Sequence, residues 1–248
     1  MKLIAITLPL LLAVSSASHP LAAQTPQGPR VRIYSDHSHG QAPLPPPYAT
    51  VAAKLGAEVV PHQTPITAAA LQGYRLAVLR APLLEIKDDE RAALVGFVKQ
   101  GGSLLLVVDE ERRTSLATTR VNDLIQPFGL TLTADVPYLH NNGAIATKGP
   151  INAADRELPY SGGRAVEGGT PFAWQLDKEG KPAQVFGALT VVGSSGRVVV
   201  LGEGMASLFL GTPAGVRLTG VPNDPSQTTY WGKDSAIFME ELLTWLMG

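Results

Sequence analysis

The residues best suited to chemistry are titratable side chains that stand just after short, β-branched runs of the sequence. They are Asp36, His37 and His39 after the first run, Arg80 after the third, Asp109, Glu110 and Glu111 after the fourth, and Glu203 after a late run. In a doubly wound sheet, ligands bind beyond the carboxyl ends of the strands. We therefore expect these side chains to converge on one edge and to hold a polar ligand, a water or a divalent metal. The alternative is that strand ends are polar because they face water.

The most distinctive local pattern is Asp36-His37-Ser38-His39-Gly40. Two histidines that stand two residues apart on an extended segment point to opposite sides, so at most one of them shares a site with Asp36 unless the loop turns. His39 is the better candidate, because Gly40 permits a close approach of backbone or ligand. A metal site is one interpretation, although no HExxH or similar spacing is present. The other is a histidine that hydrogen-bonds backbone within its own loop.

The sequence has no evident nucleophile or nucleotide motif. Because the chain contains 0 cysteines, disulfides, a thiolate nucleophile and Cys-bound metals are excluded. Gly193-Ser194-Ser195-Gly196 does not fit the G-x-S-x-G elbow and is better explained as a hairpin turn. Gly202-Glu203-Gly204 lacks the third glycine of a dinucleotide fingerprint. No cofactor is therefore expected, and a divalent metal at the carboxylates and imidazoles is the alternative.

His140 belongs to a second candidate region, between Pro137 and Trp174, in which aromatic rings and amides are interspersed with glycine. Rings stack on the faces of sugars and amides bond their hydroxyls, so this composition suits a carbohydrate or a peptidoglycan fragment. The alternative is a long loop whose aromatic residues pack on the sheet.

The elements that must position these residues follow a βαβ pattern between Val31 and Asp109. We expect strands at 31–34, 58–60, 76–79 and 103–108, and helices at 48–55, 66–71 and 88–98, with Asp88 as the cap of the last. Beyond them we expect a helix at 121–128, a strand at 130–132, a hairpin of 184–192 and 197–201, and a final helix at 236–247. Residues 137–169 show no clear periodicity. The fold class is thus α/β, a flavodoxin-like, doubly wound and mostly parallel sheet with an added β-hairpin region.

The first 23 residues have the order of a secretory signal peptide, with Lys2, an apolar run from Leu3 to Val14, and then small residues. The apolar run is shorter than the roughly 20 residues that span a membrane. We expect cleavage after Ala17 or Ala23, then a linker at 24–30 and one α/β domain at 31–248. The protein is therefore predicted to be periplasmic or extracellular, without stable membrane insertion after cleavage; the alternative is a buried N-terminal helix.

The net charge of -1 and the charged fraction of 17% leave no basic surface for nucleic acid or for an anionic membrane. Neither is an expected partner.

The order of segments resembles the class I glutamine amidotransferase-like superfamily. The residues that carry this resemblance are 74–79, Ala81-Pro82, 89–98, Gly101-Gly102 and 103–109. The chain is similar in particular to a non-catalytic branch that contains the trehalose-utilisation (ThuA-like) proteins, the DUF4350 proteins and the intraflagellar-transport and gliding-motility domains. Residues 36–41, the helix ending in Phe128-Gly129, and 197–204 followed by 238–246 support this branch.

The resemblance implies the fold, but one departure bears on activity. Amidotransferases of this fold carry a cysteine, activated by a histidine, at an elbow after the third strand, where this chain reads Leu79-Arg80-Ala81-Pro82-Leu83. Glutaminase activity is therefore not expected. The leading function is a non-catalytic binding module for a small polar or carbohydrate ligand, or for an envelope protein. The alternative is a hydrolase, metal-assisted or not, that acts on sugars or envelope polymers. Its acid, base or metal ligands would be Asp36, His39, Asp109, Glu110 and Glu203.

Overall fold

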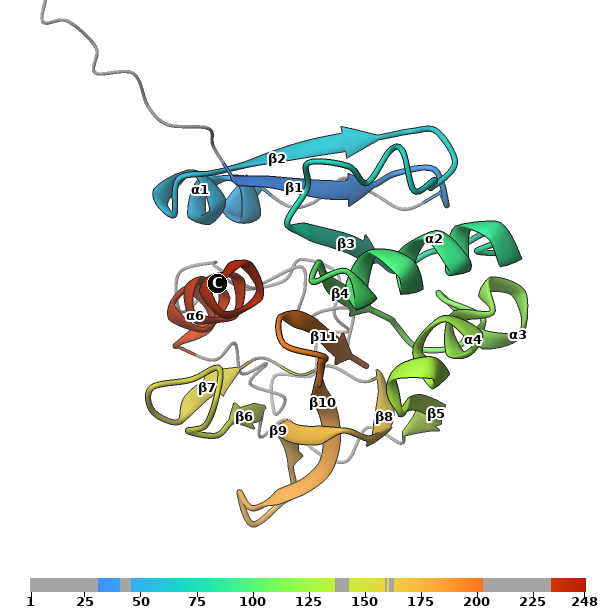
Figure 1. Cartoon of the computed structure of the whole chain (residues 1–248). Coiled ribbons are helices and arrows are strands. Elements are labelled where there is room, and N and C mark those ends of the chain that lie inside the picture. The colour runs from blue at the N-terminus through green and yellow to red at the C-terminus, as the bar shows by residue number, and fades with distance from the viewer. Residues whose placement is uncertain (1–30, 41–45, 137–142, 159, 161–162, 203–232) are drawn as a thin grey trace, which may run out of the picture.

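A nine-stranded sheet organises the computed structural model, which describes residues 31–40, 46–136, 143–158, 160, 163–202 and 233–248 (Figure 1). The strand order is β2-β1-β3-β4-β11-β10-β9-β6-β7. The parallel part comprises β1 (Val31–Asp36), β2 (Ala57–His62), β3 (Leu76–Arg80), β4 (Ser103–Val107) and β11 (Gly196–Leu201). Antiparallel pairing then adds β10 (Pro182–Val192), β9 (Thr170–Leu176), β6 (Ala144–Ala146) and β7 (Arg156–Leu158). The predicted fold class, a mostly parallel α/β sheet with an added hairpin region, is confirmed.

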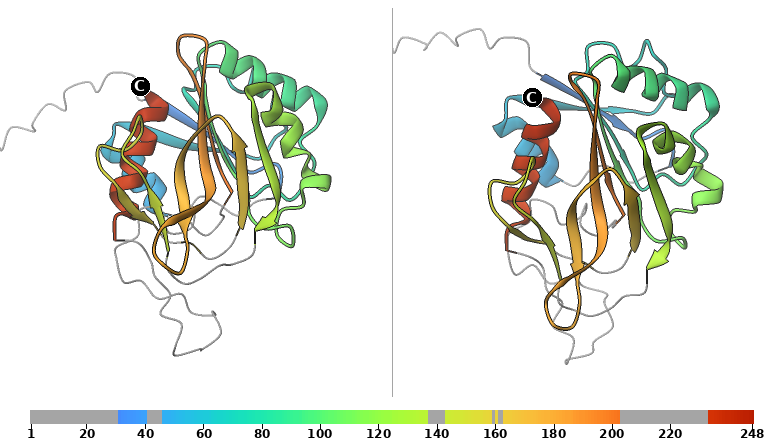
Figure 2. Two further views of the ribbon diagram at one scale, coloured as in Figure 1. Left: turned by 90° about the horizontal axis from the view of Figure 1, so that it is seen from below. Right: turned by 60° about the horizontal axis from the view of Figure 1, so that its bottom comes forward.

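Helices cover both faces of the sheet, as Figure 2 shows from two sides. Helices α1 (Pro46–Lys54) and α6 (Ser235–Met247) lie on one face. Helices α2 (Asp88–Lys99), α3 (Leu116–Thr119) and α4 (Val121–Ile125) lie on the other, followed by a 3-10 turn at Gln126–Phe128. Every residue of β3 and β4 is buried, which explains why these two strands read as apolar runs without alternation.

Two arginines fasten the end of α6 to the sheet. Arg75 donates from Nε to the backbone oxygen of Met247 at 3.0 Å and from Nη2 to that of Gly248 at 3.2 Å. Arg197 donates to the backbone oxygen of Trp245, and its guanidinium lies 5.1 Å from the centre of the Trp245 ring. Cations at a helix C-terminus complement its dipole, so α6 is held by charge as well as by its apolar face.

Most expected elements are present, but several differ in extent. The N-cap position of α2 is Lys87 and not Asp88; its side chain makes no cap bond, but the Glu90 carboxylate accepts the Lys87 N–H at 3.0 Å. The predicted helix at 121–128 ends as a 3-10 turn containing Pro127. The strand predicted at 130–132 is β5 (Leu130–Val136), which pairs with β8 (Gly163–Gly168) in a separate two-stranded sheet. The region without periodicity thus contains strands β6, β7 and β8.

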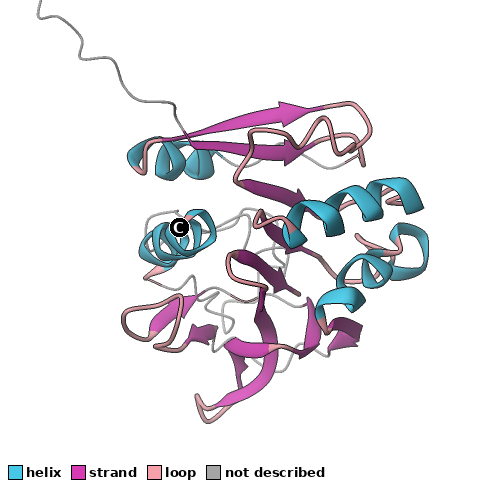
Figure 3. Cartoon of the chain, viewed as in Figure 1, coloured by secondary structure: helices cyan, strands magenta, loops and turns pink. Residues whose placement is uncertain are grey.

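The helix predicted at 66–71 is wrong. The segment forms turns between β2 and β3, so this connection contains no helix (Figure 3). Only Ile66 and Leu71 are buried among residues 65–72, and they stand five positions apart. An amphipathic helix buries residues at spacings of three and four, so this alanine-rich segment has no continuous apolar stripe to pack.

No helix in the described part of the chain is both long and apolar enough to cross a membrane. Residues 1–30, where the signal peptide and the linker are predicted, lie outside that part.

Candidate functional site

The pleat of the sheet divides the predicted site into two clusters on opposite faces. Along β1, Ile33 belongs to the core under α1 and α6, whereas Tyr34 belongs to the core under α2, so Asp36 shares the α2 side with Tyr34. Arg80 pairs in register with Val107, which lies on the α1 and α6 side. The candidates thus lie at the carboxyl ends of the strands, as expected, but they do not form one group.

On the α2 side, His39 bridges two buried carboxylates. Its Nδ1 lies 2.7 Å from Oδ2 of Asp36, and its Nε2 lies 3.2 Å from Oε2 of Glu90. The exposed fractions of Asp36, His39 and Glu90 are 2%, 4% and 3%. Carboxylate oxygens only accept hydrogen bonds, so an imidazole that bonds one with each nitrogen donates from both and carries a positive charge. We call these three residues the buried triad.

Backbone groups from three segments complete the buried triad. Asp36 Oδ1 accepts the Ser38 N–H at 3.0 Å and the Ser38 hydroxyl at 2.7 Å. Glu90 accepts the Ile66 N–H on Oε1 at 2.9 Å and the Lys87 N–H on Oε2. The triad therefore ties the loop after β1 to the turn segment after β2 and to the first turn of α2.

The charge state of the buried triad follows from these contacts. Burial alone would lower the pKa of His39, but the hydrogen bonds and charges of Asp36 and Glu90 outweigh it and raise the pKa above 6.5. Burial would likewise raise the pKa of Asp36, but the hydrogen bonds from His39 and Ser38 hold it below 3.8. An imidazole whose two N–H groups both donate to carboxylates has no lone pair left to take a proton or to bind a metal.

A pocket of about 280 Å³ opens above the buried triad. Its walls come from the loops after β1, β2 and β3 and from the start of α2. The lining residues are Ser38, His39, Gln63, Pro65, Leu84, Glu85, Lys87 and Glu90. We call it the carboxyl-edge pocket. It offers an amide, a hydroxyl and charges of both signs to a ligand.

On the α1 and α6 side, Arg80 lies close to Tyr48 and Asp109. Arg80 is 8% exposed, and burial lowers its pKa, although Tyr48 and Asp109 oppose this effect. Burial raises the pKa of Asp109, whose Oδ1 accepts the Glu110 N–H at 2.8 Å and whose Oδ2 accepts Arg113 at 3.3 Å. Burial also raises the pKa of the Tyr48 hydroxyl, which has no hydrogen-bond partner in the described residues.

The turn after β3 has a strained backbone. Ala81 has a φ of 45°, in the left-handed region that residues other than glycine rarely adopt. Its N–H bonds the Val107 carbonyl at 2.7 Å, which fixes the turn against β4. This is the region in which the resemblance places the catalytic cysteine, and the strained position carries a methyl group.

Of the remaining predicted residues, His37 and Glu110 have other partners than the buried triad. His37 Nε2 is 3.0 Å from the Ser35 hydroxyl, and Glu110 pairs with Arg112 and Arg113 at the surface. His140 and Glu203 lie outside the described residues. Within the described ranges, no three or more His, Asp or Glu side chains are grouped so that they could hold a metal ion.

Sequence reasoning missed two charged residues. Glu90 is not among the predicted site residues, although its place three residues after Lys87 is that of a capping-box glutamate. The buried Arg164 holds the loop after β4 through the carbonyls of Asp109 and Thr114 and through Glu111. Hydrogen bonds from Ser115 and Arg164 lower the pKa of Glu111 to about 2. Arg164 stands in a glycine-rich stretch that gives no signal for such a role.

Comparison with known proteins supports the fold. No family model matches the chain, and neither does any curated protein sequence. The mmIFT52 N-terminal domain aligns with a TM-score of 0.62 and 15% identity, over 87% of this chain and 97% of that domain. A cytoplasmic protein from Salmonella typhimurium aligns with a TM-score of 0.52 and 11% identity, over 88% of this chain and 97% of that protein. A putative ThuA-like protein from Bacteroides uniformis aligns over 92% of this chain and 94% of its own, with 12% identity and a TM-score of 0.48. The first two likenesses show a shared fold.

The buried triad makes a prediction about stability. Asp36→Asn or Glu90→Gln leaves a buried imidazolium with one charged partner, and breaking a buried ion pair in this way costs about 3–5 kcal/mol. Urea unfolding should show that loss in each variant. Glu58→Gln, an exposed change on β2, is the matched control and should stay within about 0.5 kcal/mol of the parent. Equal unfolding free energies for all three variants would contradict a stabilising role of the triad.

The pKa shifts predict a pH dependence. The raised pKa of His39 contributes stability that is fully present below 6.5 and is lost as the pH rises through the folded-state value. The lowered pKa of Asp36 contributes stability that is present above 3.8 and is lost as the pH falls through its folded-state value.

Burial lowers the pKa of His62, so its effect on the pH dependence of stability is opposite in sign to that of His39. The contribution of His39 is therefore measured as the difference in stability between the parent and a His39 variant. We expect the stability gap between the parent and His39→Gln, followed by urea unfolding, to be widest between about pH 4 and pH 6.5 and to narrow on the alkaline side. A gap that is constant with pH would show that His39 is uncharged in the folded protein.

Proposed function

We propose that this chain is an exported, non-catalytic binding module on an amidotransferase-like α/β fold, related to the ThuA-like and DUF4350 branch, and that it holds a small polar or carbohydrate ligand at the carboxyl-edge pocket. The observation that carries this proposal is the buried triad: the only described histidine in the pocket has both ring nitrogens bonded to carboxylates.

The chemistry of the site argues against catalysis. A general base needs a nitrogen or oxygen that can take a proton from the substrate, and His39 has none free. A nucleophile at the strained turn after β3 would need a hydroxyl or thiol, whereas Ala81 supplies neither. In a Ser-His-Asp triad the serine hydroxyl and the aspartate bond different nitrogens of the histidine. Here the Ser38 hydroxyl donates to Asp36 and not to Nε2 of His39, so this arrangement is not formed.

The form of the carboxyl-edge pocket supports a small ligand. Its volume of about 280 Å³ lies just below the range of roughly 300–1,000 Å³ that is usual for drug-sized ligands. Glu85 and Gln63 can each accept from a hydroxyl or an amine, and Lys87 can donate to a hydroxyl. A single sugar or amino-sugar unit matches this size and chemistry. The rigid triad below it would keep the pocket in its binding form.

The hydrolase interpretation has less support. Of its five candidate residues, Asp36 and His39 are bonded to each other, and Asp109 and Glu110 each pair with an arginine. Glu203 lies outside the described residues. We therefore do not propose hydrolysis.

Binding at the carboxyl-edge pocket can be tested with paired glutamine variants. A thermal-shift screen against monosaccharides, amino sugars and muropeptides should reveal a ligand, since about 2.7 kcal/mol of stabilisation is expected at 100 times its dissociation constant. Gln63→Ala should remove the shift, because it deletes an amide from the pocket wall. Gln126→Ala, which deletes an exposed amide in the 3-10 turn outside the pocket, should keep it.

Two outcomes would contradict the proposal. Turnover of the bound sugar would show an enzyme, and the absence of a shift with any compound would favour an envelope protein as the partner.

Export can be tested on the full chain in a Gram-negative host. We expect the protein in the periplasm, with an N-terminus at Ser18 or Gln24 by amino-terminal sequencing. Leu10→Arg interrupts the apolar run and should leave an uncleaved protein in the cytoplasm. A periplasmic product in both cases, or an uncleaved parent, would overturn this part of the proposal.

A further inference from the structure

The connection between β2 and β3 departs from the usual form of a parallel crossover. Parallel strands are normally joined by a helix that covers the sheet. Here residues 63–75 form turns, and only Ile66 and Leu71 pack firmly on the sheet. This segment leaves part of the space beside α2 unfilled.

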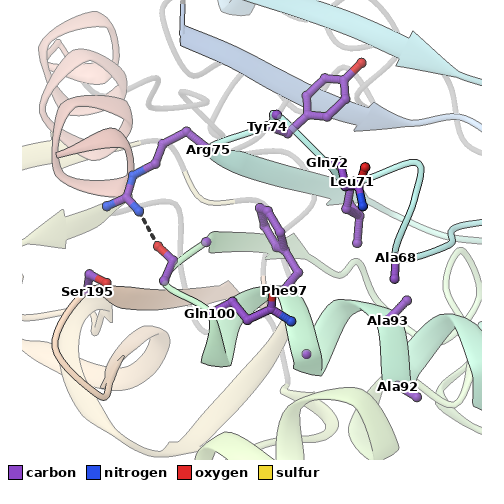
Figure 4. Close-up of a pocket in the computed structure, with 14 residues that line it drawn as sticks. Ala68, Leu71, Gln72, Tyr74, Arg75, Ala92, Ala93, Phe97, Gln100 and Ser195 are labelled. Atoms are coloured by element: carbon purple, nitrogen blue, oxygen red, sulfur yellow. Dashed lines mark hydrogen bonds between the residues drawn. The ribbon is translucent and has the colours of Figure 1, made fainter.

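The unfilled space is a cleft of about 730 Å³ between the turn segment and α2 (Figure 4). Ala92, Ala93 and Gly96 form the helix side of the cleft, where larger side chains would have filled it. The other wall comes from Ala68, Leu71, Gln72, Gly73 and Tyr74, and the end is closed by Arg75, Gly101, Gly102 and Ser195. We call it the crossover cleft. Its volume lies well within the range of about 300–1,000 Å³ for small-molecule sites.

The crossover cleft has no free charge. None of its lining residues is Asp, Glu or Lys. The one cation, Arg75, donates to the backbone oxygens of Gly101, Met247 and Gly248. Burial also lowers the pKa of Arg75, with the nearby Arg197 as a second cause. A cationic ligand would find no opposite charge here, and an anionic one would compete with three backbone oxygens for the only lining cation, which favours a neutral ligand.

Two aromatic rings in the cleft are held in place. A Cβ at Gly102 would lie 2.4 Å from Cζ of Phe97, so the ring packs directly on the glycine backbone. The Tyr74 hydroxyl lies 2.6 Å from His62 Nε2, and Arg32 stacks at 4.4 Å from the ring centre. Rings that are fixed before binding lose little conformational freedom when a ligand packs on them.

Free polar groups complete the crossover cleft. The side chains of Gln72, Gln100 and Ser195 make no hydrogen bond to any described residue, and all three are exposed. Two amides and a hydroxyl provide both donors and acceptors beside the rings. A neutral molecule with apolar ring faces and hydroxyl edges satisfies all of these groups.

We propose that the crossover cleft binds a neutral saccharide, which packs a face on Phe97 and Tyr74 and bonds its hydroxyls to Gln72 and Gln100. The carboxyl-edge pocket includes Glu90 in the first turn of α2, whereas the crossover cleft is lined by later residues of the helix, from Ala92 to Gln100. The two sites share no lining residue, and this second site goes beyond the proposed function.

Isothermal titration of the full-length protein with maltotriose, cellotriose and N,N′,N″-triacetylchitotriose tests the proposal. We expect one of these neutral sugars to bind. The double variant Gln72→Ala, Gln100→Ala should weaken it by about fivefold to 150-fold, the effect of losing two ordinary hydrogen bonds.

A second variant separates loss of the cleft from loss of folding. A Cβ at Gly96 would meet only Gln100 Nε2, at 4.0 Å, so a side chain can start there, and Gly96→Leu places its bulk on the cleft-lining position. Leucine also favours the helix more than glycine does. Gly96→Leu should therefore abolish sugar binding while the melting temperature stays the same or rises.

The control is Gln63→Ala, which alters the carboxyl-edge pocket and should leave binding in the crossover cleft intact. Binding lost in Gln63→Ala but kept in Gly96→Leu would assign the sugar to the carboxyl-edge pocket and overturn this inference while supporting the proposed function. No binding of any neutral oligosaccharide would overturn the inference alone, because the proposed function has its own ligand screen.

Discussion

The contact of His39 with Asp36 and Glu90 is the constraint on which the carboxyl edge of this sheet depends. Burying three ionisable groups carries a large desolvation cost, which is offset only when every charge has a partner and every remaining lone pair a donor. The N–H groups of Ser38, Ile66 and Lys87 meet that condition. Three loops and the start of α2 are therefore fixed by one set of charges, and the pocket above them has a rigid floor.

The sequence allowed the strands to be predicted because β3 and β4 are buried on both faces and read as unbroken apolar runs. It indicated His39 and not His37 as the partner of Asp36. In the structure the side chains of Asp36 and His39 lie 2.7 Å apart, because the hydrogen bonds of Ser38 to Asp36 turn the loop back. The contact of Glu90 with His39 could not be predicted from local spacing. Glu90 comes from a helix 51 residues later than His39, and such a contact depends on tertiary packing, for which sequence spacing carries no signal.

The alternation of side chains along each strand explains why the candidate residues form two clusters and not the single site that the sequence predicts. Alternation along β1 and β3 sends Asp36 and Arg80 to opposite faces, although both stand at strand ends. The alternation along each strand can be predicted from the sequence, but the register of β1 relative to β3, which decides which face each residue shares, cannot. The error at 66–71 has another cause: helix propensity without an apolar stripe does not stabilise a short helix. Because residues 66–71 lack an apolar stripe and form turns in place of a helix, the crossover cleft stays open beside the small residues of α2.

The two sites differ in how binding and stability are related. In the carboxyl-edge pocket, freeing His39 for catalysis would require removal of Asp36 or Glu90, and either change leaves a buried charge unpaired. Catalysis and folding therefore make opposed demands on the same imidazole. The crossover cleft carries no such conflict, because Arg75 already has its partners, and the side-chain amides of Gln72 and Gln100 make no hydrogen bond within the part of the chain that the structure describes. Ligand binding by this protein is thus expected from side chains that do not stabilise the core. Such side chains lie around the buried triad and not within it.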